Sequence, residues 1–231
     1  MLLKGLQKLT LLDYPGKMAA TVFAGGCNFR CPFCHNASLV VGKRLKETPS
    51  VSEEDFFAFL KKRQGLLEGV CVSGGEPTLY RDLIPFLNNI KELGYLVKLD
   101  TNGYRPEVLK EAVRGGYVDY VAMDIKNSKE SYQKTVGLEK FDIKPIEESV
   151  DFLMSGTVDF EFRTTLVRQL HTERDMYSIA TWLRGDEKYF LQSFIDSGDL
   201  LSDRLSGYDK KETEDLLKLI KVHVKNAQIR G

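Results

Sequence analysis

The sequence has no excess of charge of either sign, because 33 Lys and Arg residues balance 33 Asp and Glu residues. Proteins that bind nucleic acid or anionic membranes through general electrostatics are usually basic, so this balance argues against both partners. The sequence also lacks an uncharged apolar run of about 20 residues, the length that a membrane-spanning helix needs. We therefore expect neither a membrane nor a nucleic acid as a partner.

A secretory signal is also missing, since lysines interrupt residues 1–17 and no cleavage site is evident. We therefore expect a cytoplasmic protein. Cysteine is scarce, with four residues in a chain of 231. In a reducing compartment, clustered cysteines are more often metal ligands or redox groups than structural disulfides.

Apolar runs typical of strands alternate with helical patterns along almost the whole chain. We predict strands at 17–23, 69–73, 95–100, 119–124, 158–166 and 188–194, of which 188–194 is the last. We predict helices at 52–63, 81–94, 105–116, 145–154, 173–184 and 209–226. Strands that alternate with crossover helices form parallel sheets. The pattern predicts an α/β fold, a partial (β/α)6 barrel with parallel strands, as a single domain over 1–231.

Three of the four cysteines, Cys27, Cys31 and Cys34, lie in one loop at 24–38, directly after the first predicted strand. Four thiolates complete the ligand set of a [4Fe–4S] cluster, so three would leave one iron with an open site. Zinc is the alternative, with Cys71 or His35 as the fourth ligand. Cys71 lies in a strand pattern and is more simply interpreted as a small core residue. One remaining cysteine does not support a second cluster.

The C-x3-C-x2-C spacing of these cysteines resembles that of the radical S-adenosylmethionine (SAM) superfamily. The resemblance implies that the three thiolates hold a [4Fe–4S] cluster and that SAM binds its open iron. It places Phe33 where the family's aromatic residue contacts adenine through its backbone. The segment SGGEP, 73–77, resembles the family's GGE motif, in which Gly74, Gly75 and Glu76 receive the methionyl ammonium. Without the cysteines, this segment would equally fit a turn before a helix.

The segments DYPGK (13–17), LDTNG (99–103) and VAMDIK (121–126) resemble activating enzymes of glycyl-radical enzymes. The resemblance implies a site for a monovalent cation formed by Asp100, Thr101, Asp124 and the carbonyl of Ala122. It implies SAM contacts from Asn102, Lys126 and Arg163, with Lys126 assigned a catalytic role beside the cysteines. The simpler alternatives are a turn at 100–103 and a surface ion pair between Asp124 and Lys126.

The sequence departs from the group at one position. Some activases carry a histidine near the end of the last strand that reaches the SAM ribose, whereas residues 191–197 contain none. Gln192 or Ser193 would have to take its place. We interpret His171 as a loop residue and His223 as a residue on a helix surface.

Among the activases, residues 5–17 and 20–36 most resemble the longer form of the anaerobic ribonucleoside-triphosphate reductase activating proteins. The resemblance implies a radical SAM oxidoreductase that takes electrons from flavodoxin or ferredoxin, cleaves SAM, and generates a glycyl radical on that reductase. One alternative is an activase of another glycyl-radical enzyme, such as pyruvate formate-lyase. Others are a radical SAM enzyme acting on a small molecule or a tRNA base, and a zinc or iron–sulfur binding module without turnover.

Overall fold

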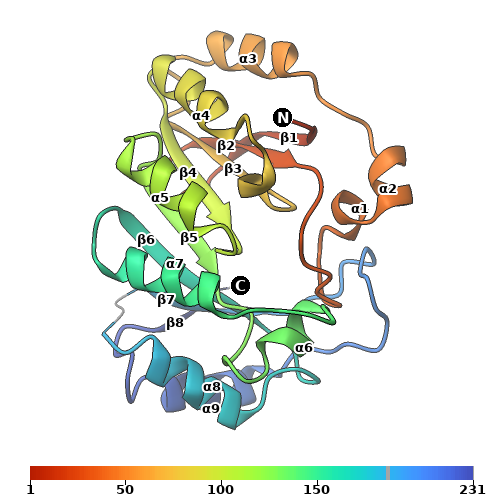
Figure 1. Ribbon diagram of the computed structural model, residues 1–231, viewed down its shortest axis with the longest axis vertical. Helices are drawn as coiled ribbons and strands as arrows, with labels where there is room; N and C mark the ends of the chain where they lie inside the picture. The colour runs from red at the N-terminus through yellow and green to blue at the C-terminus, as the bar shows by residue number, and fades with distance from the viewer. Residues whose placement is uncertain (186–187, 231) are drawn as a thin grey trace. The chain divides into compact units, whose positions relative to one another are not determined.

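The computed structural model describes residues 1–185 and 188–230 (Figure 1). Its contacts divide the chain into two compact units, which are described separately. The first unit contains residues Met1–Asn28, Ser38–Ala122 and Pro145–Asp159. The second contains Phe29–Ala37, Met123–Lys144 and the chain from Phe160 onward. The expectation of a single domain stays a prediction.

The sheet of the first unit follows the order of the chain. Its strands are β1 (Leu3–Thr10), β2 (Ala19–Ala24), β3 (Gly69–Gly74), β4 (Leu96–Thr101) and the start of β5 (Tyr120–Asp124). β1 is antiparallel to β2, whereas β2, β3 and β4 are parallel. The Asp119 N–H donates to the Val97 carbonyl at 2.9 Å, which brings the chain entering β5 alongside β4.

Helices connect these strands, as the alternating pattern predicts. They are α1 (Ala37–Val40), α2 (Gly42–Glu47), α3 (Glu53–Lys62), η1 (Pro77–Leu79), α4 (Leu83–Glu92), α5 (Pro106–Arg114) and α7 (Lys144–Met154). Ser52 caps α3, because its Oγ accepts a hydrogen bond from the Asp55 N–H at 3.0 Å. The predicted helices of this unit are confirmed to within two residues at each end.

The second unit holds the end of β5 and the strands that follow it in the chain. Its elements are α6 (Tyr132–Val136), β6 (Asp159–Leu166), α8 (Glu173–Trp182), β7 (Tyr189–Ser193), α9 (Lys210–Ile220) and β8 (Gln228–Arg230). The strands β6, β7 and β8 are parallel, and the Ile125 N–H donates to the Arg163 carbonyl at 2.8 Å, just after β5. The predicted α/β fold with parallel strands is confirmed.

Two predicted boundaries near the end of the chain are wrong. The helix predicted at 209–226 ends at Ile220, and 188–194 is not the last strand, because β8 follows. Val224 and Ala227 are buried after the helix ends, and Ile229 pairs with Leu191 of β7. The apolar residues after Ile220 therefore cover the core and join the sheet instead of extending the helical stripe.

Strand β1 is absent from the predictions, and its burial explains why. Only Leu3 and Thr10, at its two ends, are buried. An edge strand of this kind lacks the alternation of apolar and polar residues that marks a half-buried strand.

Among the described residues, no helix has the length and hydropathy required to cross a membrane.

The two faces of strands β3 and β4 differ in chemistry. Val70, Val72, Val97 and Leu99 point to one face and are fully buried. Successive side chains of a strand point to opposite faces, so the other face carries Cys71, Ser73, Lys98 and Asp100. The polar residues at the carboxyl ends of these strands begin the candidate site.

Candidate functional site

In the first unit, the segment after β3 lies against the start of the cysteine loop. The Gly75 N–H donates to the Ala24 carbonyl and the Glu76 N–H to the Gly26 carbonyl, both at 2.8 Å. A Cβ on Gly75 would lie 1.9 Å from the Gly26 oxygen, and Gly74 has a φ of +116°. Only glycine fits such a conformation and such a close approach. The two glycines therefore let the predicted GGE motif contact the cysteine loop.

Glu76 fastens the ends of β3 and β4 together. Its side chain is fully buried, and its carboxylate accepts hydrogen bonds from the Thr78 N–H and hydroxyl, the Thr101 hydroxyl and the Asn102 N–H. Burial raises the pKa of Glu76, although these hydrogen bonds act in the opposite direction. Both carboxylate oxygens already have partners within the protein, so its predicted contact with a methionyl ammonium stays a prediction.

Asn102 connects this arrangement to the first cysteine of the motif. Its amide nitrogen donates to Asn28 Oδ1 at 2.8 Å and lies 3.8 Å from Cys27 Sγ. Its Oδ1 accepts a hydrogen bond from the Tyr104 N–H at 3.0 Å. The first unit thus brings together predicted residues from three segments that are distant in sequence: Cys27, Gly74, Gly75, Glu76, Thr101 and Asn102.

Asp100 lies on the opposite face of β4 and has a partner that the sequence analysis missed. Lys98 Nζ forms an ion pair with Asp100 Oδ1, and the Ser73 hydroxyl donates to Oδ2 at 2.9 Å. Lys98 is 1% exposed, and its Nζ lies 3.8 Å from the sulfur of the buried Cys71. A lysine between two apolar residues of a predicted strand was the available signal. The interpretation of Cys71 as a buried strand residue agrees with the structure.

The other two cysteines of the motif lie in the second unit. The Cys34 N–H donates to the Cys31 carbonyl at 3.1 Å, which forms a turn around Phe33. Cys31 and Phe33 are buried, and Cys34 is partly buried. Burial is the main cause that raises the pKa of Cys31 to about 11 and also raises the pKa of Cys34. The nearby Lys126 ammonium acts in the opposite direction on both thiols but does not outweigh burial. The thiols would therefore lose their protons on binding a metal.

The candidate ligands are thiols, which is the ligand type that iron–sulfur clusters use. All four cysteines are thiols, with no disulfide among them. The three thiols of the motif come from one loop, as cluster ligands often do. Within residues 1–185 and 188–230, no three His, Cys, Asp or Glu side chains converge as a ready metal site. The assignment of Cys27, Cys31 and Cys34 as ligands therefore rests on their type and spacing.

Asp124, Lys126 and Arg163 form an ion-pair network in the second unit. Asp124 accepts from Lys126 Nζ and from Arg163 Nε, both at 3.0 Å. The two cationic side chains are only 19% and 14% exposed, so the network is more than a surface ion pair. Burial alone would raise the pKa of Asp124, but the two cations lower it to about 2. Lys126 Nζ also lies 5.8 Å from the centre of the Phe33 ring.

His171 is not an ordinary loop residue. It is fully buried, with Nε2 2.8 Å from the Lys126 carbonyl and Nδ1 accepting from the Val167 N–H at 3.1 Å. These contacts place the proton on Nε2, which donates to Lys126. The edge of its ring faces Phe33, with centroids 6.4 Å apart. Sequence reasoning missed this role because no local pattern marks a histidine that binds a backbone carbonyl 45 residues away.

Strand register separates the two candidates for the ribose position. In the ladder between β6 and β7, Arg163 pairs with Phe190. Two residues further along, Thr165 pairs with Gln192. Paired residues of parallel strands point to the same face, so Gln192 shares the face of Arg163. Ser193 points to the opposite face.

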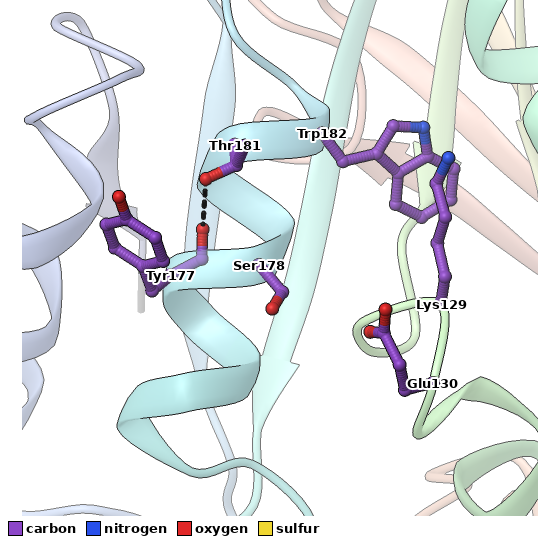
Figure 2. A pocket seen from close by; sticks show the side chains of 6 residues that line it. All are labelled: Lys129, Glu130, Tyr177, Ser178, Thr181 and Trp182. Carbon is purple, nitrogen blue, oxygen red and sulfur yellow. Dashed lines mark hydrogen bonds between the residues drawn. The ribbon is translucent and has the colours of Figure 1, made fainter.

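A separate pocket of about 330 Å³ lies on the second unit. Figure 2 shows the Lys129 side chain reaching across the ring of Trp182, with Nζ 4.9 Å from the ring centre. The lining residues are Lys129, Glu130, Tyr177, Ser178, Thr181 and Trp182. None of them is a residue that the cysteine motif or its accompanying segments predict.

Similarity to known proteins assigns the chain to a superfamily. The family model described as the Radical SAM superfamily matches residues 21–175, so the chain belongs to that superfamily. Over 99% of its length, the chain is 33% identical to a "Putative glycyl-radical enzyme activating enzyme" of Methanocaldococcus jannaschii, of which it covers 95%. The predicted resemblance to the activase group is thereby confirmed.

Two further similarities concern the fold and an enzyme with a different named activity. The chain is 29% identical, over 72% of its length, to 70% of the 7-carboxy-7-deazaguanine synthase of Koribacter versatilis. The crystal structure of Streptococcus suis SuiB bound to S-adenosylmethionine matches 90% of the chain with a TM-score of 0.67 and 14% identity. The chain spans about half of SuiB, at 49%, and this likeness concerns the fold alone.

Proposed function

We propose that the protein is an activating enzyme that cleaves SAM at a [4Fe–4S] cluster and generates a glycyl radical on a partner enzyme. The observation that carries the proposal is the similarity to the Methanocaldococcus protein over almost the full length of both chains. The partner proposed is anaerobic ribonucleoside-triphosphate reductase, on the resemblance of residues 5–17 and 20–36. Flavodoxin or ferredoxin is the proposed reductant, and the proposed location is the cytoplasm.

Cys27, Cys31 and Cys34 would hold the cluster. With SAM, such a cluster supplies one-electron reductive cleavage and the removal of a hydrogen atom from glycine. Without side chains, Gly74 and Gly75 let the end of β3 lie directly against the backbone of Ala24 and Gly26 at the start of the cysteine loop, where the methionyl end of SAM would bind. The contacts of Glu76 hold that backbone against the β4 loop, so its side chain supports the site in addition to any direct contact.

The charged residues of the second unit suit the carboxylate end of SAM. Arg163 and Lys126 are two cations that both bind the Asp124 carboxylate. An arginine can bind a carboxylate while keeping a second partner, because its guanidinium has five donors. We assign the SAM carboxylate to Arg163, the adenine to the Phe33 backbone, and the ribose to Gln192 rather than Ser193.

A second function has an observation in its favour. The similarity to 7-carboxy-7-deazaguanine synthase over 72% of the chain favours a radical SAM enzyme that acts on a small molecule. Such an enzyme would share the cysteines, the glycines and Glu76. The two functions differ in whether a protein glycine is the substrate.

The first experiment uses anaerobically purified protein with reconstituted iron. Dithionite and SAM are added and 5′-deoxyadenosine is measured, with Cys31→Ala as the test variant and Cys71→Ala as the matched control. We expect the wild type and the control to bind iron and cleave SAM. In Cys31→Ala, both iron binding and SAM cleavage should fall below the wild-type level. A protein without iron, or with iron but no cleavage, would contradict the enzyme assignment.

The second experiment tests the partner. Anaerobic ribonucleoside-triphosphate reductase is incubated with the active protein, and electron paramagnetic resonance is used to detect a glycyl radical. We expect a signal that requires SAM and disappears with Cys31→Ala. SAM cleavage without a radical on this reductase would reject this partner, and other glycyl-radical enzymes and small molecules would then be tested.

A further inference from the structure

A buried ammonium group lies beside Asp100, one of the residues from which the resemblance to activases implies a monovalent-cation site. Lys98 is 1% exposed, and its Nζ contacts Asp100 Oδ1. The second oxygen of Asp100 accepts from the Ser73 hydroxyl at 2.9 Å. Lys98 and Asp100 are two residues apart on β4 and therefore point to the same face. All of these residues belong to the first unit.

The position of Lys98 needs an explanation beyond stability. Burying an ammonium group is costly unless a partner compensates for the lost hydration, and Asp100 is its ion-pair partner here. Buried ion pairs are often no more stabilising than apolar residues of the same volume. A residue such as methionine would fill this place in a strand without that cost. The pair therefore indicates a need for positive charge beside the Asp100 carboxylate.

The residues around Asp100 do not fit an additional cation. Thr101, another predicted ligand, points to the opposite face, where its hydroxyl donates to Glu76 at 2.8 Å and accepts from the Gly103 N–H at 3.1 Å. One carboxylate oxygen of Asp100 accepts from Lys98 Nζ, and the other accepts from the Ser73 hydroxyl. An added sodium or potassium ion would have to displace the ammonium group, which already supplies one positive charge.

We propose that Lys98 takes the place of the monovalent cation, so that this protein needs neither sodium nor potassium to bind SAM. Lys98 is then a positioning residue: it fixes Asp100 and compensates its charge at the carboxyl end of β4, next to the segment that carries Asn102. The inference rests on the proposed function, because SAM is the ligand concerned. The cation expected near Asp100 and Asp124 would accordingly have no role.

The first test needs neither cluster nor SAM. The thermal midpoint of the cluster-free protein is compared in potassium chloride and tetramethylammonium chloride at equal ionic strength, with Lys98→Met as the test variant. Lys91→Met is the matched control, because Lys91 pairs with Asp119 in the same unit at 2.7 Å but is 27% exposed. We expect potassium to raise the midpoint of Lys98→Met alone, because only there is the place of the ammonium group beside Asp100 open to the ion.

A third variant identifies the carboxylate that is responsible. Lys98→Met combined with Asp100→Asn removes both charges, so the response to potassium should disappear. The proposal would be overturned if potassium raised the thermal midpoint of the wild type more than that of Lys91→Met. This comparison can be made even if Lys98→Met does not fold. A folded Lys98→Met without a potassium response would also overturn it and leave Lys98 as a structural ion pair.

The second test measures SAM itself with the reconstituted protein. We expect the wild type to have the same KM for SAM in both salts. For Lys98→Met we expect a KM roughly tenfold higher in tetramethylammonium than in potassium, about 1.4 kcal/mol, with little change in kcat. Failure of the proposed function would appear as no 5′-deoxyadenosine in any variant. Failure of this inference would appear as cleavage that requires potassium in the wild type.

Discussion

Each unit holds one carboxylate that belongs to the predicted site residues, and the two carboxylates are held by different means. In the first unit, Glu76 is fully buried and its hydrogen-bond donors are hydroxyl and backbone N–H groups without charge. In the second, Asp124 is 29% exposed and is bound by two cations, Lys126 and Arg163. Burial dominates in the first case and raises the pKa of Glu76, whereas charge dominates in the second and lowers that of Asp124 to about 2.

The difference shows what each carboxylate can do. Neutral donors in fixed backbone positions determine geometry, so Glu76 is suited to holding two loops together. Charged side chains that are still partly exposed can exchange partners, so the Asp124 network is suited to receiving a charged ligand. Substitutions at Gly75, Glu76 and Asp124 test this contrast between a carboxylate that connects two loops and one that binds charged groups, and His171 tests the backbone support of Lys126.

The largest effect is expected where the loop held by Glu76 touches the cysteine loop. Gly75→Ala would place a Cβ 1.9 Å from the Gly26 oxygen, so the backbone must move. We expect the free energy of unfolding to fall by roughly 3 kcal/mol and iron binding to be lost. Denaturant unfolding and iron analysis measure both. Gly42→Ala is the control, because its Cβ would meet nothing within 4 Å; equal effects of the two changes would disprove the steric explanation.

Glu76→Gln should have the next largest effect. The amide keeps the shape of the carboxylate but has one accepting oxygen, so Thr101 or Asn102 would lose its acceptor in a buried place. We expect a loss of about 2 kcal/mol that changes little with added salt, since the donors are neutral. Denaturant unfolding at two ionic strengths measures this, with the exposed Glu54→Gln as the control. A loss that salt abolishes would mean that the charge of Glu76 matters more than its hydrogen bonds.

Asp124→Asn tests the other half of the contrast. The substitution leaves Lys126 and Arg163 close together without the negative charge of Asp124, but partial exposure weakens their repulsion. We expect a loss of about 1 kcal/mol that shrinks as salt is added, and a changed affinity for SAM. The measurements are unfolding against ionic strength and equilibrium binding of SAM. The exposed Asp203→Asn should change neither, and salt-independent destabilisation by Asp124→Asn would contradict a role based on charge.

The smallest effect concerns His171, which binds the backbone of Lys126. Burial lowers the pKa of His171 below its usual value of 6.5, so in the window below 6.5 the unfolded chain binds a proton that the folded chain does not. Stability should therefore fall as the pH drops from about 7 to about 5, by less than about 1 kcal/mol from this residue. Thermal midpoints across this range should decline less steeply in His171→Asn than in the wild type. His223→Asn is the control, and identical slopes for the wild type and His171→Asn would contradict the prediction.

Much of the fold could be predicted from the sequence, because strands and helices leave local periodic patterns. The predicted helix at 52–63 and strand at 69–73 differ from α3 and β3 by at most a residue at each end. Patterns failed where a segment lacks its own periodicity, as in β1, or where apolar residues serve a different element, as Val224 and Ala227 do after α9. The residue types of the site were also predictable, since Cys27, Cys31 and Cys34 are close in sequence.

By itself, the sequence determined the superfamily, through three cysteines at one spacing and the glycines that follow the next strand. It also determined that strands and helices alternate. Only the tertiary structure decided that Lys98 faces Asp100, that Glu76 is buried between two loops, that His171 holds Lys126, and that Gln192 rather than Ser193 shares a face with Arg163. The physical reason is that cysteine spacing and amphipathic periodicity are properties of neighbours along the chain. Ion pairs and buried hydrogen bonds depend instead on the register between strands, and register arises only when the chain folds.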